Sequence, residues 1–207
     1  MKLLHLDSSV TGPYSVSRTI SAEIVEALKA RHPGIEVIYH DLVTEPAMHL
    51  SPAHLAAFQG GEVTDPALGA DLARGGAYLQ ELLDADILVI GVAMYNLTVP
   101  TQLKAWIDRV AVAGQTFRYT ETGPEGLLPK GKKIYFASAR GGFYSGDSPA
   151  AAMDFHETYL RAVFALLGAT DVEIIRAEGI GLGPDARQAA LDGARREIAA
   201  LAPALAA

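Results

Sequence analysis

The chain contains no cysteine. This absence excludes disulfide bonds, thiolate metal sites and cysteine nucleophiles, and nothing in the composition requires an oxidising compartment. An excess of basic residues is also missing, because 17 Lys and Arg stand against 24 Asp and Glu, a formal net charge of −7. That balance argues against non-specific binding to nucleic acid or anionic membranes, although it leaves room for a local basic pocket.

Long hydrophobic runs are absent as well. The run at 87–94 is far shorter than the roughly 20 residues of a membrane-spanning helix, and the apolar residues near the start end at Asp7, too early for a signal peptide. We therefore expect a soluble cytoplasmic protein. Half of the 207 residues are hydrophobic, so a chain of this size can bury roughly 70% of its unfolded surface. Without a repeat or linker, residues 1–207 are expected to form one domain.

The sequence does contain a regular alternation of strand and helix patterns. Short apolar or β-branched runs predict strands at 2–6, 35–39, 87–92, 134–137 and 172–175. Apolar residues at helical spacing predict helices around 20–28, 68–83, 103–110, 160–167 and 191–201. The strand at 87–92 is apolar at nearly every position, which is typical of a parallel sheet covered on both faces. The alternation predicts a doubly wound, five-stranded α/β sheet with helices on both faces.

Three segments interrupt this alternation. Residues 42–65 hold several prolines and glycines and are expected to form a long irregular excursion. Residues 115–133 are expected to form a loop with room for a short hairpin. Residues 179–184 partly match a dinucleotide-binding motif, but they lack its final glycine and its acidic partner. We interpret them as a turn before the last helix.

In a doubly wound sheet, ligands bind beyond the carboxyl ends of the strands. This rule selects residues 7–17, 93–98 and 139–146, which follow the first, third and fourth predicted strands of the sheet. The three segments are expected to lie on one rim. Their location together indicates a binding site more strongly than any one of them does alone.

The first of these segments offers hydroxyl groups at the start of a predicted helix. They belong to Ser8, Ser9, Thr11, Ser15 and Ser17. Free N–H groups and partial positive charge at a helix N-terminus suit a phosphate. A Walker lysine and a G-x-G-x-x-G motif are both absent, so the pattern favours a phosphate that is held rather than transferred. The alternative is an ordinary helix start with Ser17 as the N-cap.

The other two segments offer a planar surface and free backbone groups. Met94 and Tyr95 can face a flat ring, and Asn96 can donate hydrogen bonds; the alternative for these side chains is core packing. Gly141 and Gly142 allow backbone N–H groups to approach a ligand without an intervening Cβ. The alternative for the glycine pair is a turn with unusual backbone angles.

Several strings across the chain carry a resemblance to one family. They are Ser9 with Ser15-Val16-Ser17, Met94-Tyr95-Asn96-Leu97, Leu103-Lys104-Ala105-Trp106-Ile107-Asp108, Gly114-Gln115-Thr116-Phe117-Arg118-Tyr119, and Lys132-Lys133 with Arg140-Gly141-Gly142. They resemble the FMN-dependent NADH-azoreductases, which are flavodoxin-like quinone and azo reductases. The resemblance extends from the first strand to the last helix. It implies a flavodoxin-like fold, a bound FMN, NADH or NADPH as electron donor with NADH favoured, and a homodimer.

The resemblance also implies a role for particular residues. The FMN phosphate would be held by Ser9, Ser15, Val16 and Ser17. The isoalloxazine ring would lie along Met94, Tyr95, Asn96 and Leu97, and its pyrimidine edge would meet Ala139, Arg140, Gly141 and Gly142. No side chain is expected to act as an obligatory acid or base, because the flavin carries the chemistry. No metal is expected, since the six histidines lack a metal-ligand spacing.

Two positions depart from the family pattern. Family members usually carry an aromatic residue at the position of Leu97 and commonly a serine at that of Ala139. The missing serine hydroxyl removes at most one side-chain hydrogen bond, worth roughly 0.5–1.5 kcal/mol. We therefore expect somewhat weaker FMN binding that nevertheless persists.

Three further residues have roles that follow from their chemical type or from the resemblance. Tyr119 and Phe117 are expected to form an aromatic wall against the substrate, with core packing as the alternative for each. Arg140 is expected to help stabilise negative charge on the reduced pyrimidine edge, with an exposed surface cation as the alternative.

The implied reaction is a ping-pong, two-electron transfer from NADH through FMN to an azo compound or a quinone. A flavodoxin-type electron carrier is one alternative, but it would not need segments 42–65 and 115–133. A phospho-receiver regulator is another, and it fits poorly because Asp7 stands alone where an acidic cluster is required. A quinone reductase with only incidental azo activity is a third, and the residues do not separate it from an azoreductase.

Overall fold

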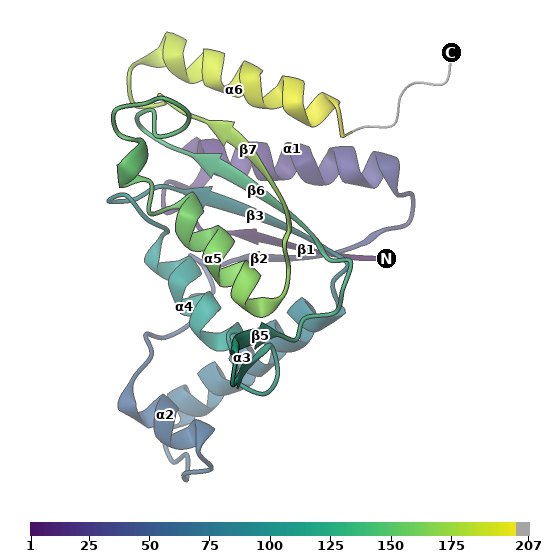
Figure 1. Ribbon diagram of the computed structural model, residues 1–207, viewed down its shortest axis with the longest axis vertical. Coiled ribbons are helices and arrows are strands. Elements are labelled where there is room, and N and C mark those ends of the chain that lie inside the picture. The colour runs from purple at the N-terminus through teal and green to yellow at the C-terminus, as the bar shows by residue number, and fades with distance from the viewer. Residues whose placement is uncertain (202–207) are drawn as a thin grey trace.

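The computed structural model describes residues 1–201 and centres on a five-stranded parallel sheet (Figure 1). The strands are β1 (Lys2–Asp7), β2 (Glu36–Asp41), β3 (Ile87–Ala93), β6 (Lys133–Ala139) and β7 (Asp171–Ala177). They lie in the order β2-β1-β3-β6-β7, and every neighbouring pair is parallel. The order reverses between β1 and β3, as in flavodoxin-like folds. The predicted doubly wound parallel sheet is therefore confirmed.

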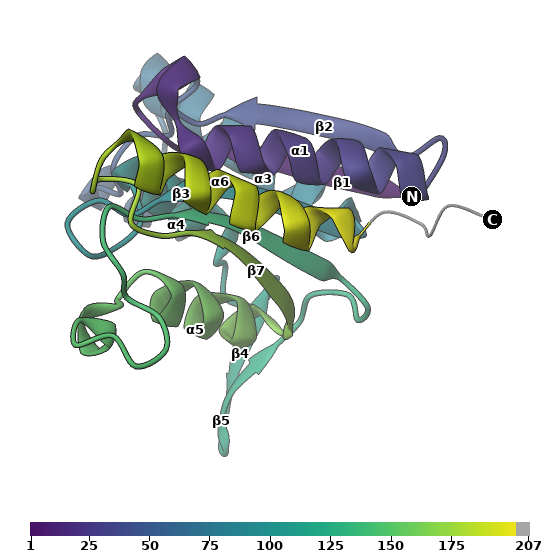
Figure 2. The same ribbon diagram turned by 90° about the horizontal axis from the view of Figure 1, so that it is seen from above.

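Helices cover both faces of the sheet, as Figure 2 shows. One face carries α1 (Val16–Arg31) and α6 (Pro184–Ala199), and the other carries α3 (Pro66–Asp84), α4 (Thr101–Val110) and α5 (Glu157–Leu167). Successive strand side chains point to opposite faces. Val89 accordingly packs on the α1 side while Ile90 packs on the α4 side. Burial on both faces explains why β3 is apolar throughout.

Residues 42–65 are less irregular than the sequence indicates. They contain a short helix, α2 (Pro52–Phe58), which begins with a capping box formed by Ser51 and His54. Seven residues are too few to show a helical repeat of apolar positions. The α3 helix is continuous through Gly75 and Gly76. A Cβ at Gly75 would lie 2.8 Å from Arg109 Cδ, so glycine permits close packing of α3 on α4.

The segment after α4 forms a hairpin that projects from the body of the molecule (Figure 2). Its antiparallel strands are β4 (Phe117–Thr120) and β5 (Gly123–Gly126). Just after β5, Leu128 N–H donates to the carbonyl of Leu167, the last residue of α5, at 3.0 Å. Because α5 ends just before β7 begins, the hairpin lies at the amino edge of the sheet. The ligand-binding edge predicted above is the opposite one.

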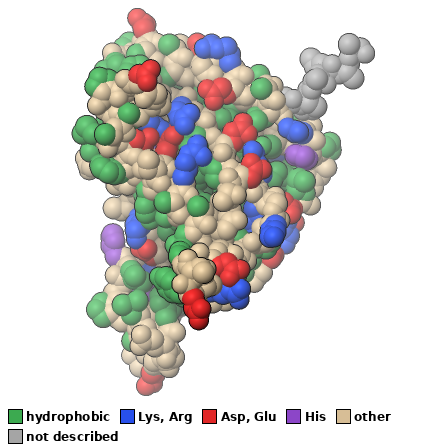
Figure 3. Space-filling view, in the orientation of Figure 1, with side chains coloured by type: hydrophobic (Ala, Val, Ile, Leu, Met, Phe, Trp, Pro, Cys, Tyr) green, Lys and Arg blue, Asp and Glu red, His purple; other side chains and the backbone are tan. Residues whose placement is uncertain are grey.

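The surface of the molecule mixes charges of both signs, but apolar side chains gather in places (Figure 3). One such place is the loop that follows β6 and includes the 3-10 turn η2 (Ala151–Met153). Phe143, Met153 and Phe155 are exposed on that loop. A second 3-10 turn, η1 (Gly12–Tyr14), precedes α1. Among the helices of residues 1–201, none is long and apolar enough to cross a membrane.

Candidate functional site

The three segments selected from the sequence meet at the carboxyl edge of the sheet. Met94 N–H donates to the carbonyl of Ala139 at 2.8 Å, which joins the segments after β3 and β6. The Tyr95 hydroxyl lies 3.0 Å from Ser9 Oγ, which joins the segments after β1 and β3. The predicted location of the three segments on one rim is therefore confirmed, and direct hydrogen bonds link the segments.

The loop between β1 and α1 gathers hydroxyl and N–H groups. Ser15 is the N-cap of α1, because its Oγ accepts a hydrogen bond from Arg18 N–H at 3.3 Å. The alternative in which Ser17 caps the helix is therefore wrong; Ser17 lies in the first turn, with its Oγ 3.0 Å from Ser15 Oγ. In the described chain, the N–H groups of Val16 and Ser17 have no protein acceptor. These donors at the positive end of α1 suit an anion.

The segment after β3 forms a tight turn with an unusual backbone. Tyr95 and Thr98 exchange two backbone hydrogen bonds, at 3.0 and 3.1 Å. Between them, Asn96 and Leu97 both adopt left-handed conformations, with φ of 48° and 72°. Such angles cost about 1–3 kcal/mol per residue outside glycine and cluster at functional sites. The N–H groups of Asn96 and Leu97, at the centre of this turn, have no acceptor among residues 1–201.

The glycine pair after β6, Gly141 and Gly142, is supported by hydrogen bonds from a neighbouring turn. The carbonyls of Arg140, Gly141 and Gly142 accept hydrogen bonds of 3.0–3.1 Å from the N–H groups of residues 179–181. Residues 179–183 are thus the predicted turn before α6, and they also support the glycine pair. Over residues 1–201, neither Gly141 N–H nor Gly142 N–H meets a protein acceptor. A Cβ at Gly141 would meet no atom within 4 Å, so there is open space on the Cα side of this residue.

Arg140 is buried, which makes the alternative of an exposed surface cation wrong. Its side chain is 0% exposed and pairs with Asp154 at 3.1 Å, with Glu178 at 3.2 Å and with Glu157. Burial lowers the pKa of the Arg140 guanidinium, while Asp154 and Glu178 oppose that shift. Arg140 N–H donates to the carbonyl of Ala177. The residue therefore anchors the glycine pair, and its guanidinium points into the protein.

Other candidates near the rim are also part of the core. Ala139 is 2% exposed and packs in the cluster between the sheet and the α1 side. His156, at the start of α5, is 0% exposed, and burial lowers its pKa to about 4. His5 and His54 are buried as well.

The two aromatic candidates for substrate contact lie away from the rim. Phe117 is 8% exposed and belongs to the core, so the alternative of core packing holds for it. Tyr119 is 79% exposed on the hairpin at the amino edge. Within one chain, Tyr119 and the three loops therefore lie at opposite edges of the sheet.

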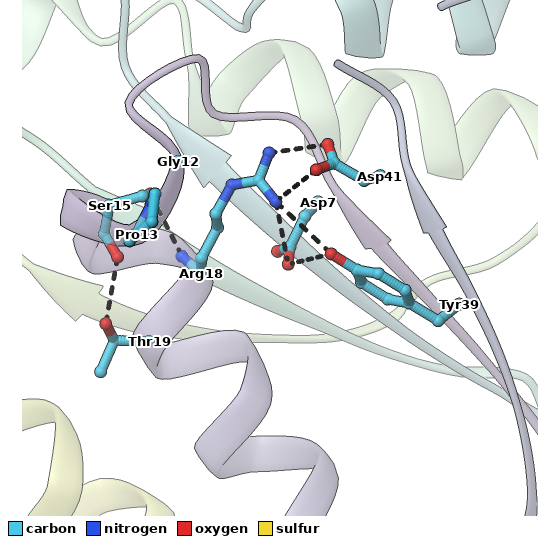
Figure 4. A pocket seen from close by; sticks show the side chains of 8 residues that line it. All are labelled: Asp7, Gly12, Pro13, Ser15, Arg18, Thr19, Tyr39 and Asp41. Atoms are coloured by element: carbon cyan, nitrogen blue, oxygen red, sulfur yellow. Dashed lines mark hydrogen bonds and ion pairs between the residues drawn. The ribbon is translucent and has the colours of Figure 1, made fainter. Parts of the chain in front are cut away.

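Arg18 and Asp41 are part of the site that the sequence analysis missed. Figure 4 shows them beside Asp7 and Tyr39, lining a hollow of about 490 Å³. The Arg18 guanidinium bonds the Asp41 carboxylate at 2.8 and 2.7 Å, and this contact holds the pKa of Asp41 below its ordinary value. Burial and Asp7 raise the pKa of Tyr39 to about 12. No local motif reveals the pair, since the pairing of β1 with β2 brings Asp41 to this loop.

The chain belongs to the family with the flavodoxin-like fold, whose model matches residues 1–202. Among curated relatives, it is 54% identical over 202 residues to the FMN-dependent NADH:quinone oxidoreductase 2 of Bradyrhizobium diazoefficiens, covering 97% of this chain and 98% of the relative. It is also 54% identical over 199 residues to an FMN-dependent NADH:quinone oxidoreductase of Sinorhizobium fredii, covering 96% of each.

Solved structures show the same resemblance. An azoreductase of Bacillus anthracis superposes with a TM-score of 0.84 at 29% identity, covering 97% of this chain and 98% of that one. An FMN-dependent NADH-azoreductase of Bacillus anthracis in complex with FMN gives a TM-score of 0.81 at 25% identity, covering 98% and 100%. The predicted family and fold are therefore confirmed.

The donor groups of the site fit FMN. Its phosphate needs hydroxyl and N–H donors at a positive helix end, which Ser9, Ser15 and the start of α1 offer. Its pyrimidine edge carries hydrogen-bond acceptors, and the unbonded N–H groups of Gly141 and Gly142 are suitable donors. The two sets of donors stand on either side of the Tyr95 turn, because β3 lies between β1 and β6 in the sheet.

Proposed function

We propose that this chain is an FMN-dependent oxidoreductase that uses NADH to reduce quinones and azo compounds by two-electron transfer. The observation that carries the proposal is the meeting of three donor-bearing loops at one edge of the sheet, linked by the Met94–Ala139 and Ser9–Tyr95 hydrogen bonds. The names of relatives that are 54% identical over nearly the whole chain support the same activity.

In this proposal, each loop binds a different part of the cofactor. The phosphate is held by Ser9, Ser15, Val16 and Ser17; the ring lies along Met94, Tyr95, Asn96 and Leu97; and the pyrimidine edge meets Ala139, Arg140, Gly141 and Gly142. Bound FMN supplies the two-electron chemistry. The backbone donors at the glycine pair stabilise negative charge on the reduced edge, and Arg140 contributes by holding that pair in place.

The acceptor is proposed to be a planar molecule that approaches over the apolar rim. Phe143 and Phe155 are 56% and 58% exposed beside the glycine pair and the Tyr95 turn. Phe155 is tied to that turn because its carbonyl accepts a hydrogen bond from Thr98 Oγ1 at 3.4 Å. Since NADH and the acceptor would occupy the same side of the ring, they would bind in turn. This gives ping-pong kinetics and favours a flavoenzyme over an electron carrier.

We further propose that the protein is a homodimer in which Tyr119 serves the site of the other chain. Tyr119 is exposed and lies at the edge of the sheet opposite the loops of its own chain. An apolar hollow of about 610 Å³ between α3, α4 and residues 57–63, with Phe58 exposed beside it, offers a face for a second copy.

The dimer proposal is tested by replacing Tyr119 with Ala. We expect sedimentation at dimer mass and an increase in KM for a dye or quinone, with little change in FMN content. Arg118→Ala, on the same hairpin, is the control and should keep its KM. A monomeric wild-type protein, or an unchanged KM for Tyr119→Ala, would contradict this role.

Two further points belong to the proposal. The family match over residues 1–202 supports a single flavodoxin-like FMN-binding domain for residues 1–207. A reaction that consumes NADH takes place where NADH is regenerated, and we therefore assign the protein to the cytoplasm.

The decisive test of the proposed function is a visible spectrum followed by anaerobic addition of NADH. We expect a bound-flavin spectrum that bleaches without a lasting semiquinone and returns when menadione or methyl red is added. A carrier would instead need a separate reductase before any bleaching with NADH. A protein that stays colourless after incubation with FMN would refute the proposed function.

A further inference from the structure

We infer that Arg18 is a positioning residue that makes the site discriminate phosphorylated from unphosphorylated flavin. The inference rests on the proposed function, because it concerns the loop assigned there to the FMN phosphate. Arg18 donates hydrogen bonds to Ser9 and Ser15, at the two ends of that loop. Its positive charge also compensates the nearby carboxylate of Asp41 (Figure 4).

The first part of the argument is geometric. Arg18 Nε and Nη2 donate to the carbonyl of Ser9 at 3.1 and 2.9 Å. At the other end of the loop, the backbone N–H of Arg18 donates to Ser15 Oγ at 3.3 Å, a bond that any residue at this position keeps. A single residue thus fixes the two serines that are proposed to hold the phosphate. The planar guanidinium can bond a carbonyl and a carboxylate at once, which a lysine ammonium does not reproduce.

The second part concerns charge. The Asp41 carboxylate is bonded to Arg18, and Asp7 Oδ2 lies 3.8 Å from Arg18 Nη1. Asp7 is 4% exposed and Asp41 is held in place by Val43 N–H. Without Arg18, two carboxylates would face the loop with no cation between them. They would repel a phosphate dianion, but they would have little effect on an uncharged flavin.

The backbone groups proposed to meet the ring do not depend on Arg18, and only the Tyr95 hydroxyl reaches the phosphate loop, at Ser9 Oγ and Val10 N–H. The turn after β3 is closed by its own backbone hydrogen bonds between Tyr95 and Thr98, and Met94 is bonded to Ala139. The glycine pair is supported by residues 179–181. Arg18 contacts neither of these segments. Its removal should therefore weaken the binding of FMN and leave the binding of riboflavin almost unchanged.

The experiment compares the dissociation constants of FMN and riboflavin for the apoprotein, measured by quenching of flavin fluorescence. The variants are Arg18→Met and Arg18→Lys. The control is Arg195→Met, which removes the same charge from a partly exposed ion pair between α6 and Glu23 of α1. Loss of one hydrogen bond to a charged group corresponds to about a 10-fold change or more.

The expected result is that FMN binding weakens at least about 10-fold in both Arg18 variants, while riboflavin binding in these variants and FMN binding in the control stay near wild-type values. Riboflavin binding also reports that a variant is folded. If Arg18→Met does not fold, Arg18→Lys, which keeps the charge beside Asp7 and Asp41, decides the question.

Three results would overturn the inference. One is unchanged FMN binding in the variants, and another is an equal loss for FMN and riboflavin. A third is wild-type FMN affinity in Arg18→Lys, because charge alone would then suffice. Failure of the wild-type protein to bind either flavin is a different result, since it would refute the proposed function itself.

Discussion

Two buried arginines each anchor a long loop of this molecule. They differ in the number of carboxylates they contact and in the role of the loop they anchor. Arg140 lies behind the glycine pair and meets three carboxylates, from Asp154, Glu157 and Glu178. Arg109 lies under segment 42–65 and meets one carboxylate, from Asp71, at 2.9 and 2.8 Å. Both arginine side chains are almost completely buried.

The partners of Arg109 belong to the excursion. Arg109 Nη2 donates to the carbonyl of Met48 at 2.7 Å, and Met48 N–H donates to Asp71 Oδ1 at the same distance. His54 Nε2 lies 3.2 Å from Asp71 Oδ2. Burial favours the protonated form of Asp71, but the hydrogen bonds from Met48 and Arg109 hold its pKa below the ordinary value.

The two clusters share a buried arginine that is paired with carboxylates, but the loops they anchor have different roles. At Arg140, the anchored loop carries the donors proposed to bind the flavin, so loss of the anchor should affect both stability and binding. At Arg109, the anchored loop lies away from the rim but includes the proposed dimer face at residues 57–63, so its loss should affect stability and dimerisation rather than FMN binding. The charge left behind also differs, because three carboxylates need more compensation than one.

The largest effect is expected for Arg140→Met. Removing one partner of a buried ion pair typically costs about 3–5 kcal/mol, and we expect the upper end because three carboxylates remain. FMN affinity should fall as well. Urea unfolding and flavin titration measure the two effects. A loss of stability with intact FMN binding would contradict the link between this cluster and the site.

A smaller effect on stability is expected for Arg109→Met, about 3 kcal/mol. In the folded fraction, FMN affinity should stay within about twofold of wild type, a difference well under 1 kcal/mol. The same titration and unfolding assays apply. If both arginine variants lose FMN equally, the distinction between the two clusters fails.

The next effect concerns pH at the Arg140 cluster. His156 has a folded-state pKa of about 4, lowered by burial and by Arg140, against about 6.5 when unfolded. The unfolded state therefore binds a proton first as pH falls, and stability is lost between about pH 6.5 and pH 4. From pH 7 to pH 5, His156 should account for about 2 kcal/mol of lost unfolding free energy.

Comparison with His156→Gln isolates this contribution from that of the carboxylates. Once the unfolding free energies of the two proteins are matched at pH 7, that of wild type should fall about 2 kcal/mol further than that of His156→Gln by pH 5. Parallel pH profiles for wild type and His156→Gln would show that His156 does not titrate in this way.

The smallest effect tests the packing around Arg109 with a matched pair of glycines. A Cβ at Gly75 would lie 2.8 Å from Arg109 Cδ, whereas one at Gly76 would meet no atom within 4 Å. We expect Gly75→Ala to lose about 1–2 kcal/mol and Gly76→Ala to gain about 0.5–1 kcal/mol from helix propensity. Thermal unfolding of both variants is the measurement. Similar changes in the two would mean that Arg109 adjusts without cost.

Much of the fold could be predicted from the sequence because its strongest patterns are local. The run at 87–92 became β3 (Ile87–Ala93), since burial on both faces leaves an apolar residue at nearly every position. The rim followed from topology, because parallel strands bring their carboxyl ends to one edge. The sequence offered Ser17 as the N-cap of α1, whereas the structure has Ser15. Two nearby hydroxyls satisfy the same sequence pattern, and only the backbone angles separate them.

The rest depended on contacts between distant residues. Arg140 was given an exposed alternative because arginine is rarely buried, but its partners come from positions 14, 17 and 38 residues further along the chain. Arg18 is paired with Asp41 by the neighbouring positions of β1 and β2. Tyr119 lies on a hairpin whose edge of the sheet is fixed by its contact with the end of α5. No local pattern carries this information.

In the turn between Tyr95 and Thr98, the hydrogen-bond donors and the side chains have separate roles. Backbone hydrogen bonds hold its shape and its central N–H groups, so the side chain at position 97 is not needed for either. Under the proposed function, Leu97 can therefore be replaced while the backbone donors of the cofactor site stay in place.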